Sequence, residues 1–137
     1  MTDATTDKLL PTGIPSWHMP YWDSLREHAV KVQKCAQCGT FRYIPKEICN
    51  RCFSGEWTWE PIEGTGTVYT HTTIRRAPTP AYQPDAPYTI VHVTMSEGFR
   101  MIGRLHGVAP EDVRIDMPVR VRYDELGDWT VLNFEAA

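Results

Sequence analysis

The stretches CAQC (residues 35–38) and CNRC (residues 49–52) decide the fold of this chain. They hold its four cysteines, with two residues between the cysteines of each pair and ten residues between the pairs. A two-residue spacer allows a tight turn that directs both sulfur atoms inward, and the intervening loop brings the second turn opposite the first. The spacing therefore predicts one tetrahedral metal site, whose ligands are Cys35, Cys38, Cys49 and Cys52.

Zinc is the metal that this spacing favours, and two alternatives remain open. The same thiols form two disulfides in an oxidising compartment, but the polar residues before them do not resemble a secretory signal. Iron fits the same sulfur cage, as in a rubredoxin-like electron carrier. A zinc ion held by four protein sulfurs has no open position for water or substrate, so we expect one structural zinc and no catalysis at this site.

Length and charge limit the classes of function. The 137 residues suit one domain, or a small core with a metal-bound appendage. Seventeen acids against fourteen bases give a net charge of −3, which argues against an extended nucleic-acid surface. No apolar run is long enough for a membrane-spanning helix, so we expect a cytoplasmic protein.

The N-terminal third is predicted to contain an arm and a helix. Residues 1–15 are polar and rich in proline and glycine, which indicates a flexible arm. Residues 16–30 hold the best helix candidate, which begins near Pro20 and has apolar residues at helical spacing. Its apolar stripe either covers the core or docks on another protein. The candidates for partner binding are Trp17, Tyr21, Trp22 and Leu25.

The rest of the chain is predicted to be β-structure. Residues 31–60 form the zinc ribbon, with strands at 31–34, 41–44 and 57–60. Residues 61–137 contain five strand candidates, at 64–74, 88–95, 99–105, 119–123 and 129–134. Gly64 and Gly66 allow the first of these to coil, which favours a five-stranded OB-fold barrel over a small open sandwich. The fold class is thus mainly β, with an N-terminal helix, a four-cysteine zinc ribbon and a C-terminal OB-fold.

The order of these motifs resembles the DUF35 family, which combines a rubredoxin-like zinc ribbon with an acyl-CoA-associated OB-fold. The likeness runs from about residue 15 to the C-terminus, and its most specific part is the joint order of helix, ribbon and Gly-x-Gly strand. Two departures are Lys46, where arginine is frequent, and Asp116-Met117, where a glycine is common. The residues that carry the likeness are Tyr21-Trp22, Ile44-Pro45-Lys46, Trp57, Trp59-Glu60, Gly64 to Val68, Pro87-Tyr88, Glu97-Gly98, Gly103 and Phe134.

The resemblance implies an accessory role rather than an independent enzyme. DUF35 proteins are partners of thiolase-superfamily proteins, including lipid-transfer-type thiolases. In such complexes the partner carries out thiolytic, Claisen, acyl-transfer or retro-aldol chemistry on CoA thioesters, in steroid, lipid or aromatic acyl-CoA metabolism. The small subunit stabilises the complex and helps to enclose the CoA thioester.

Residues 75–87 are the predicted ligand-facing loop, because they form a long connection with four prolines between two strands of a small barrel. Arg75 and Arg76 are candidates to meet the phosphates of CoA, and Tyr82 to stack on adenine or line an acyl path. Arg100 and Arg104 lie four apart in one strand and therefore share a face. The alternative for these arginines is an ordinary solvated surface.

The sequence gives weaker support to two other classes of function, an independent enzyme and a nucleic-acid-binding protein. No Ser/Cys-His-Asp order or carboxylate pair indicates an active site. His92 is an acid–base candidate if it lies on the inner barrel face, although a buried structural histidine is the alternative. Exposed rings on an OB-fold also bind single-stranded nucleic acid, but the acidic residues between them argue against it. Such a platform would use Tyr69, Tyr88, Phe99 and Tyr123.

Overall fold

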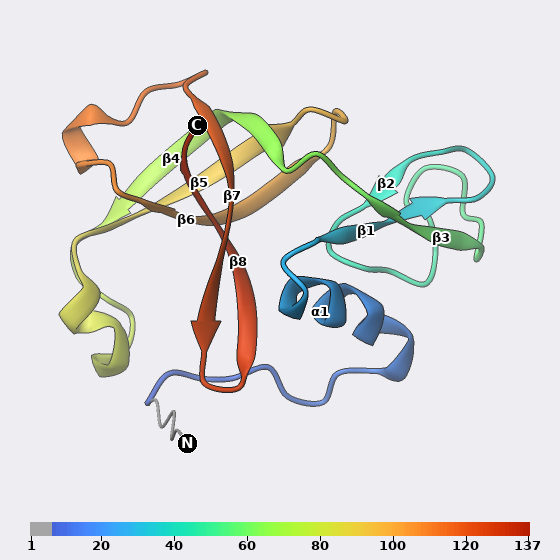
Figure 1. The fold of residues 1–137 in the computed structure, drawn as a ribbon, viewed down its shortest axis with the longest axis horizontal. Coiled ribbons are helices and arrows are strands. Elements are labelled where there is room, and N and C mark those ends of the chain that lie inside the picture. The colour runs from blue at the N-terminus through green and yellow to red at the C-terminus, as the bar shows by residue number, and fades with distance from the viewer. Residues whose placement is uncertain (1–6) are drawn as a thin grey trace. The chain divides into compact units, whose positions relative to one another are not determined.

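The computed structural model describes residues 7–137, which form two compact units. Residues 12–63 make one unit, and residues 64–137 together with residues 7–11 make the other. Strands predominate in both, as predicted (Figure 1). Among residues 7–137, no helix has the length and apolar character needed to cross a membrane.

The predicted arm, residues 1–15, is divided between these units. Residues 1–6 lie outside the described part of the chain, residues 7–11 group with the barrel, and residues 12–15 group with the ribbon. Helix and ribbon, which the sequence suggested as separate segments, belong to a single unit. The unit boundary between residues 63 and 64 falls three residues after the expected end of the ribbon.

The helix is shorter than predicted. A 3-10 turn, η1 (Ser16–His18), leads into α1 (Met19–Arg26), with Pro20 in the first turn, where its missing N–H costs nothing. The helix ends because His28 takes a left-handed conformation with φ of 55°. The predicted continuation to residue 30 is therefore wrong.

The ribbon sheet has three antiparallel strands in the order β2-β1-β3. They are β1 (Lys31–Cys35), β2 (Phe41–Arg42) and β3 (Trp57–Pro61), so β2 is two residues shorter than expected. Tyr21 of α1 meets Tyr43 edge-on, with ring centroids 6.2 Å apart. The buried apolar residues of this unit are Tyr21, Leu25, Val30, Val32, Cys35 and Cys49.

The second unit is a closed barrel with the strand order β4-β5-β6-β8-β7 (Figure 1). Antiparallel pairs join β4 with β5, β5 with β6, β7 with β8 and β4 with β7, and a parallel pair joins β6 with β8. Closure confirms the predicted OB-fold and excludes the open sandwich. The strands are β4 (Thr65–Ile74), β5 (Tyr88–Met95), β6 (Arg100–His106), β7 (Pro118–Leu126) and β8 (Trp129–Ala136).

The start of β4 closes the barrel because it pairs with strands on both sides. Gly66 is opposite Met95 of β5 and also opposite Val119 of β7. A Cβ atom at Gly66 would lie 2.4 Å from the carbonyl oxygen of Thr94 and 2.7 Å from Val93 Cγ1. Glycine thus allows the close approach of backbones that the predicted coiling requires, and a bulge between Val68 and Thr70 completes the bend.

Alternation along β5 separates the core from the outer face. Val91, Val93 and Met95 are buried, and the intervening residues are only partly covered. His92 lies on the outward side, where its ring meets Tyr69 edge-on at 5.9 Å. The prediction that His92 faces the barrel interior is therefore wrong, because the period of two places it opposite the core residues.

The connection between β4 and β5 is more ordered than a plain loop. It contains the 3-10 helix η2 (Pro80–Asp85), in which Pro80 and Pro84 restrict the backbone. Ala77 N–H donates to the side-chain oxygen of Gln83, which ties the two ends of the segment together. A further 3-10 turn, η3 (Pro110–Asp112), lies between β6 and β7.

Replacing Gly66 with alanine should destabilise the barrel by about 1–3 kcal/mol, because the added methyl group collides with backbone atoms that cannot move freely. Urea unfolding measures the free energy of unfolding. Thr72→Ala in the same strand is the control, since Thr72 is exposed. Equal stability of the Gly66→Ala and Thr72→Ala proteins would contradict the close approach at Gly66.

Candidate functional site

The four cysteine sulfur atoms converge on one point. All lie within 4.8 Å of one another, with Cys35 Sγ 3.5 Å from Cys52 Sγ and Cys38 Sγ 3.6 Å from Cys49 Sγ. The first pair begins at Cys35, the last residue of β1, and the second lies in the connection between β2 and β3. Four sulfurs at these separations suit a single tetrahedral metal ion, as the spacing predicts.

Backbone groups around the cage stabilise thiolate sulfur. The Cys38 N–H points at Cys35 Sγ at 3.5 Å and lowers the pKa of Cys35 to about 5. The Ser54 N–H acts the same way on Cys52, but burial and the neighbouring sulfurs outweigh it and raise the pKa of Cys52 to about 11. Four thiolates so close together need a cation, so this donor set fits a zinc ion.

Two buried polar side chains brace the ribbon, and the sequence reasoning missed both. Arg42 is fully buried and donates to the carbonyl oxygens of Lys46, Ser54 and Glu56 at 2.9 to 3.1 Å. Gln33, also fully buried, bonds to the backbone of Lys46 in both directions. These bonds connect the loop of the second cysteine pair to the sheet. Period-two alternation marks the buried face, but no sequence signal shows which carbonyl groups a buried arginine will find.

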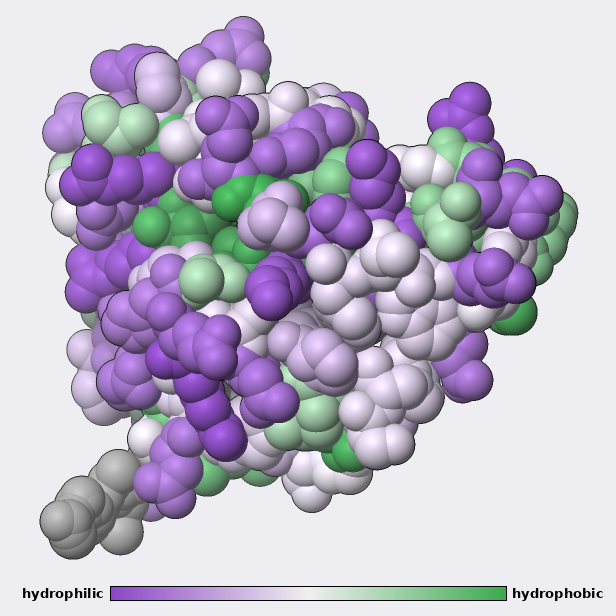
Figure 2. All heavy atoms as spheres, turned by 45° about the vertical axis from the view of Figure 1, so that its right-hand side comes forward, coloured by the Kyte–Doolittle hydropathy of each residue, from purple (hydrophilic) through white to green (hydrophobic). Residues whose placement is uncertain are grey.

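The predicted partner-binding residues differ in exposure. Leu25 is completely buried and Tyr21 is 6% exposed, so the prediction that they contact a partner is wrong. Trp17 and Trp22 are partly exposed, and Trp17 contacts Trp57 at 5.9 Å. Three large apolar residues elsewhere on the ribbon are more exposed: Ile44 at 56%, Ile48 at 53% and Phe53 at 77%. Figure 2 shows apolar side chains between hydrophilic ones on the ribbon surface.

A pocket of about 590 Å³ opens on the outer face of the barrel. Its apolar wall comes from Ile90, Ile102, Leu126 and Val131, one from each of β5, β6, β7 and β8. Tyr82 of η2 and Tyr88 of β5 add aromatic surface. Strands far apart in sequence form this wall, so no local sequence motif marks it.

The five residues predicted to bind CoA do not share one site. Tyr82 and Arg104 line the barrel pocket, whereas Arg100 stacks on Tyr69 with its guanidinium 3.7 Å from the ring centroid. Arg75 and Arg76 are exposed, and Arg76 borders a separate hollow of about 560 Å³ in the proline-rich segment. Arg100 and Arg104 lie on the same face of β6, as the spacing predicts, but they have different neighbours.

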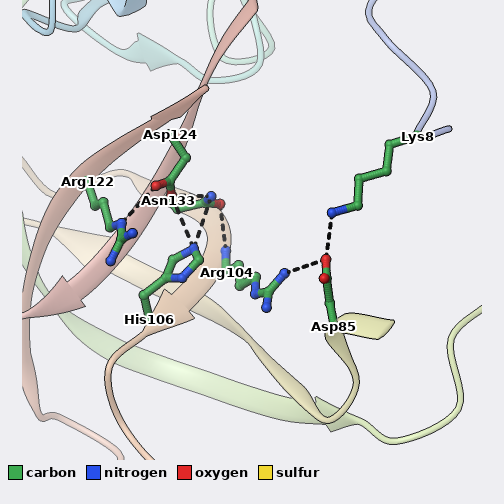
Figure 3. A network of polar contacts seen from close by, with 7 residues as sticks. All are labelled: Lys8, Asp85, Arg104, His106, Arg122, Asp124 and Asn133. Carbon is green, nitrogen blue, oxygen red and sulfur yellow. Dashed lines mark hydrogen bonds and ion pairs between the residues drawn. The ribbon is translucent and has the colours of Figure 1, made fainter. Parts of the chain in front are cut away.

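Two cations meet one carboxylate at the edge of the pocket (Figure 3). Lys8 Nζ lies 2.6 Å from Asp85 Oδ2, and Arg104 Nη1 lies 3.1 Å from the same oxygen. The hydrogen bond from Lys8, together with the one from Arg104, lowers the pKa of Asp85. Each cation also stands over a ring: Lys8 over Tyr82 at 5.0 Å and Arg104 over Tyr88 at 4.9 Å.

A second polar group lies across the pocket and joins three strands (Figure 3). His106 Nε2 is 3.1 Å from Asp124 Oδ2, which also accepts from the Asn133 amide at 2.8 Å. Arg122 Nε donates to the other oxygen of Asp124 at 2.8 Å. Burial lowers the pKa of His106, and the charge of Asp124 opposes that effect only in part. The imidazole is therefore largely neutral near pH 7.

Sequence reasoning did not find Lys8, Asp85, His106, Asp124 or Asn133. The pairings of β6 with β8 and of β7 with β8 bring the last three together, and strand pairing is not visible in a single sequence. For His106, Asp124 and Asn133, the available sequence signal was their position on the outward side of predicted strands. His106, for example, lies two residues after Arg104 and so shares its face.

Two family models match consecutive parts of the chain. The ChsH2 rubredoxin-like zinc ribbon domain matches residues 22–58, and the ChsH2 C-terminal OB-fold domain matches residues 59–124. A DUF35 domain-containing scaffold protein of Methanocaldococcus jannaschii is 32% identical over 82% of this chain and 83% of its own length. The chain belongs to the DUF35 family. This membership confirms the predicted zinc ribbon, OB-fold and structural zinc.

Further similarities point to multi-subunit proteins. A probable enoyl-CoA hydratase alpha subunit of Thermomonospora curvata is 33% identical over 72% of this DUF35 chain, which spans only 30% of that relative. A chain of the solved structure described as Ltp2-ChsH2(DUF35) aldolase has 29% identity and a TM-score of 0.81. That match covers 92% of this chain and 98% of the other.

Replacing Cys49 with serine should abolish stoichiometric metal binding and lower the stability of the ribbon, because metal binding and folding are coupled. Mass spectrometry of metal content and cobalt absorption spectra measure the loss. Arg51→Ala is the control, since the Arg51 contact to Cys49 Sγ comes from its backbone N–H. Full zinc content in Cys49→Ser would contradict the site, and a red iron-loaded protein would overturn the zinc assignment.

The His106 imidazole should titrate below its ordinary value of 6.5, and Asp124→Asn should lower its pKa further. The substitution removes the negative charge that favours the imidazolium while leaving the imidazole buried. NMR titration of the imidazole protons measures the midpoint. Glu125→Gln is the control, because Glu125 instead accepts from Thr130. A higher pKa in Asp124→Asn would contradict the ion pair.

Proposed function

We propose that this DUF35 chain is an accessory subunit of a thiolase-superfamily enzyme, and that its partner supplies the reacting groups. The observation that carries the proposal is the match to a chain of the Ltp2-ChsH2(DUF35) aldolase, which extends over 92% of this chain. Such extensive agreement includes the helix, the ribbon and the barrel together. That structure is described as an aldolase that joins a ChsH2 DUF35 protein with a second protein, Ltp2.

The chemistry of the metal site supports a non-catalytic role. The sequence has four cysteines, and all of them belong to the cage, so no thiol is left to act as a nucleophile. A metal ion with four sulfur ligands has no open coordination position for a substrate. The reacting groups for a CoA thioester would then come from the partner, in a thiolytic, Claisen, acyl-transfer or retro-aldol reaction.

The ribbon is the proposed docking surface. Its exposed Ile44, Ile48 and Phe53 are large apolar side chains that the fold of this unit leaves in contact with solvent. Such side chains contribute most to binding when a partner removes them from water. Trp17 and Trp22 are partly exposed and remain candidates in the same unit, whereas Tyr21 and Leu25 are buried.

The proline-rich segment is the proposed contact for CoA. Arg75 and Arg76 are exposed at its start, and a guanidinium binds phosphate through two parallel hydrogen bonds. Arg104 already pairs with Asp85, so we assign the phosphates to Arg75 and Arg76. Arg100 on Tyr69 offers a further flat cationic surface for a ring such as adenine.

Phe53→Asn should weaken the complex with a co-encoded thiolase-superfamily protein by about tenfold or more, since it removes an exposed apolar anchor. Asparagine tolerates the positive φ of 64° at this position, so the turn should persist. Co-expression followed by size-exclusion chromatography and calorimetry measures the association.

The matched control is Ile115→Asn, which removes a similarly exposed apolar side chain from the barrel unit. Equal affinity of the Phe53→Asn protein and the wild type would remove the ribbon from the interface. Failure of the two wild-type proteins to co-elute would overturn the accessory role itself.

A further inference from the structure

We propose that the barrel pocket binds a small amphipathic carboxylate, and that Asp85 stands where the carboxylate of this ligand would lie. The pocket is separate from the hollow at Arg76 to which we assign CoA, so the inference does not rest on the proposed function. The ligand would have an apolar body and one negatively charged end.

The position of the anion follows from two converging cations. Lys8 and Arg104 come from distant parts of the chain, and both reach the same oxygen of Asp85. Each is also held over a tyrosine ring, Lys8 over Tyr82 and Arg104 over Tyr88. These ring contacts favour the same cation positions when Asp85 moves away. Lys8 and Arg104 thus form a carboxylate-binding site, and Asp85 of the same chain occupies it.

Asp85 is suited to being replaced. It is the last residue of η2, in the connection between β4 and β5, and it contributes no pairing to the barrel wall. Its side chain and those of both cations are about a quarter exposed, and ion pairs with this access to water are weak. A ligand carboxylate can therefore exchange with it at small cost.

The remainder of the pocket suits an apolar body. Ile90, Ile102, Leu126 and Val131 project from the outer face of the barrel, where polar residues are the rule, and the buried core does not include them. Ile102 is 49% exposed. The volume of about 590 Å³ lies within the range of small-molecule sites. Aliphatic side chains from four strands thus form a wall next to the two cations.

The opposite side of the pocket fixes the orientation of the ligand. His106, Asp124 and Asn133 lie there as a hydrogen-bonded group. Arg122 balances the charge of Asp124, whereas the carboxylate of Glu125 on this side repels an anion and directs it toward Lys8 and Arg104. A neutral polar substituent, such as a hydroxyl group, is compatible with this end.

The test uses the full zinc-loaded chain and three probes of one shape: naphthoate, neutral naphthamide and naphthyl phosphate. Isothermal calorimetry gives the affinities, and amide NMR shifts locate the site. We expect saturable binding of naphthoate with shifts at Ile102 and Arg104, and weaker binding of naphthamide. Asp85→Asn should tighten naphthoate binding by about threefold or more, because it removes the competing carboxylate.

Arg104→Gln should weaken naphthoate binding by about tenfold, since it removes one of the two cations. Arg120→Gln is the control, an exposed arginine of β7 that does not line the pocket, and it should leave the affinity unchanged. Amide NMR spectra verify that each variant folds, and Arg104→Lys, which retains the charge, should restore part of the affinity.

Several results would overturn the inference. One is the absence of saturable naphthoate binding to both the wild type and Asp85→Asn. Another is equal affinity for naphthoate and naphthamide, or an equal effect of Arg104→Gln and Arg120→Gln. Tighter binding of naphthyl phosphate than of naphthoate would overturn the choice of a carboxylate.

Discussion

The electrostatics of four crowded sulfur atoms govern the first unit of this protein. Sulfurs within 4.8 Å of one another cannot all be thiolates unless a cation lies between them, and burial together with the neighbouring sulfurs raises the pKa of Cys52. A zinc ion removes it and fixes two loops with respect to the sheet. Arg42 and Gln33 then satisfy carbonyl groups that these loops bury. The exposed apolar side chains of the ribbon depend on this arrangement for their positions.

Closure of the sheet governs the structure of the barrel, as the metal site governs that of the ribbon. The start of β4 pairs with both β5 and β7, and Gly66 makes this possible because its backbone approaches that of Thr94. Closure places outward residues of β5, β6, β7 and β8 around one pocket. The metal site thus determines the proposed partner surface, and barrel closure determines the proposed small-molecule pocket. Neither surface is a local property of the sequence.

The sequence predicts the features that depend on local spacing. The intervals between Cys35 and Cys52 identify the metal site, and the alternation along residues 88–95 separates Val91, Val93 and Met95 from the opposite face of β5, although it does not show which face is buried. Gly64 and Gly66, just before and within β4, indicate its coiling. These predictions hold because tight turns and strand periodicity are set by neighbouring residues.

Features that depend on tertiary contacts were missed or wrong. A helical stripe does not tell whether Leu25 faces a core or a partner, and the structure buries it. The helix ends before His28, which has a left-handed conformation, and no glycine at this position indicates the end in the sequence. The pairing of Asp85 with Lys8 spans 77 residues, so only the folded chain brings these charges together.

The accessory role is tested most directly by the turnover of a CoA thioester in three samples: this chain alone, the co-encoded thiolase-superfamily protein alone, and the two combined. The account predicts no turnover by this chain alone, and a rate in the combined sample well above that of the partner alone. Turnover by this chain alone at the rate of the combined sample would contradict it.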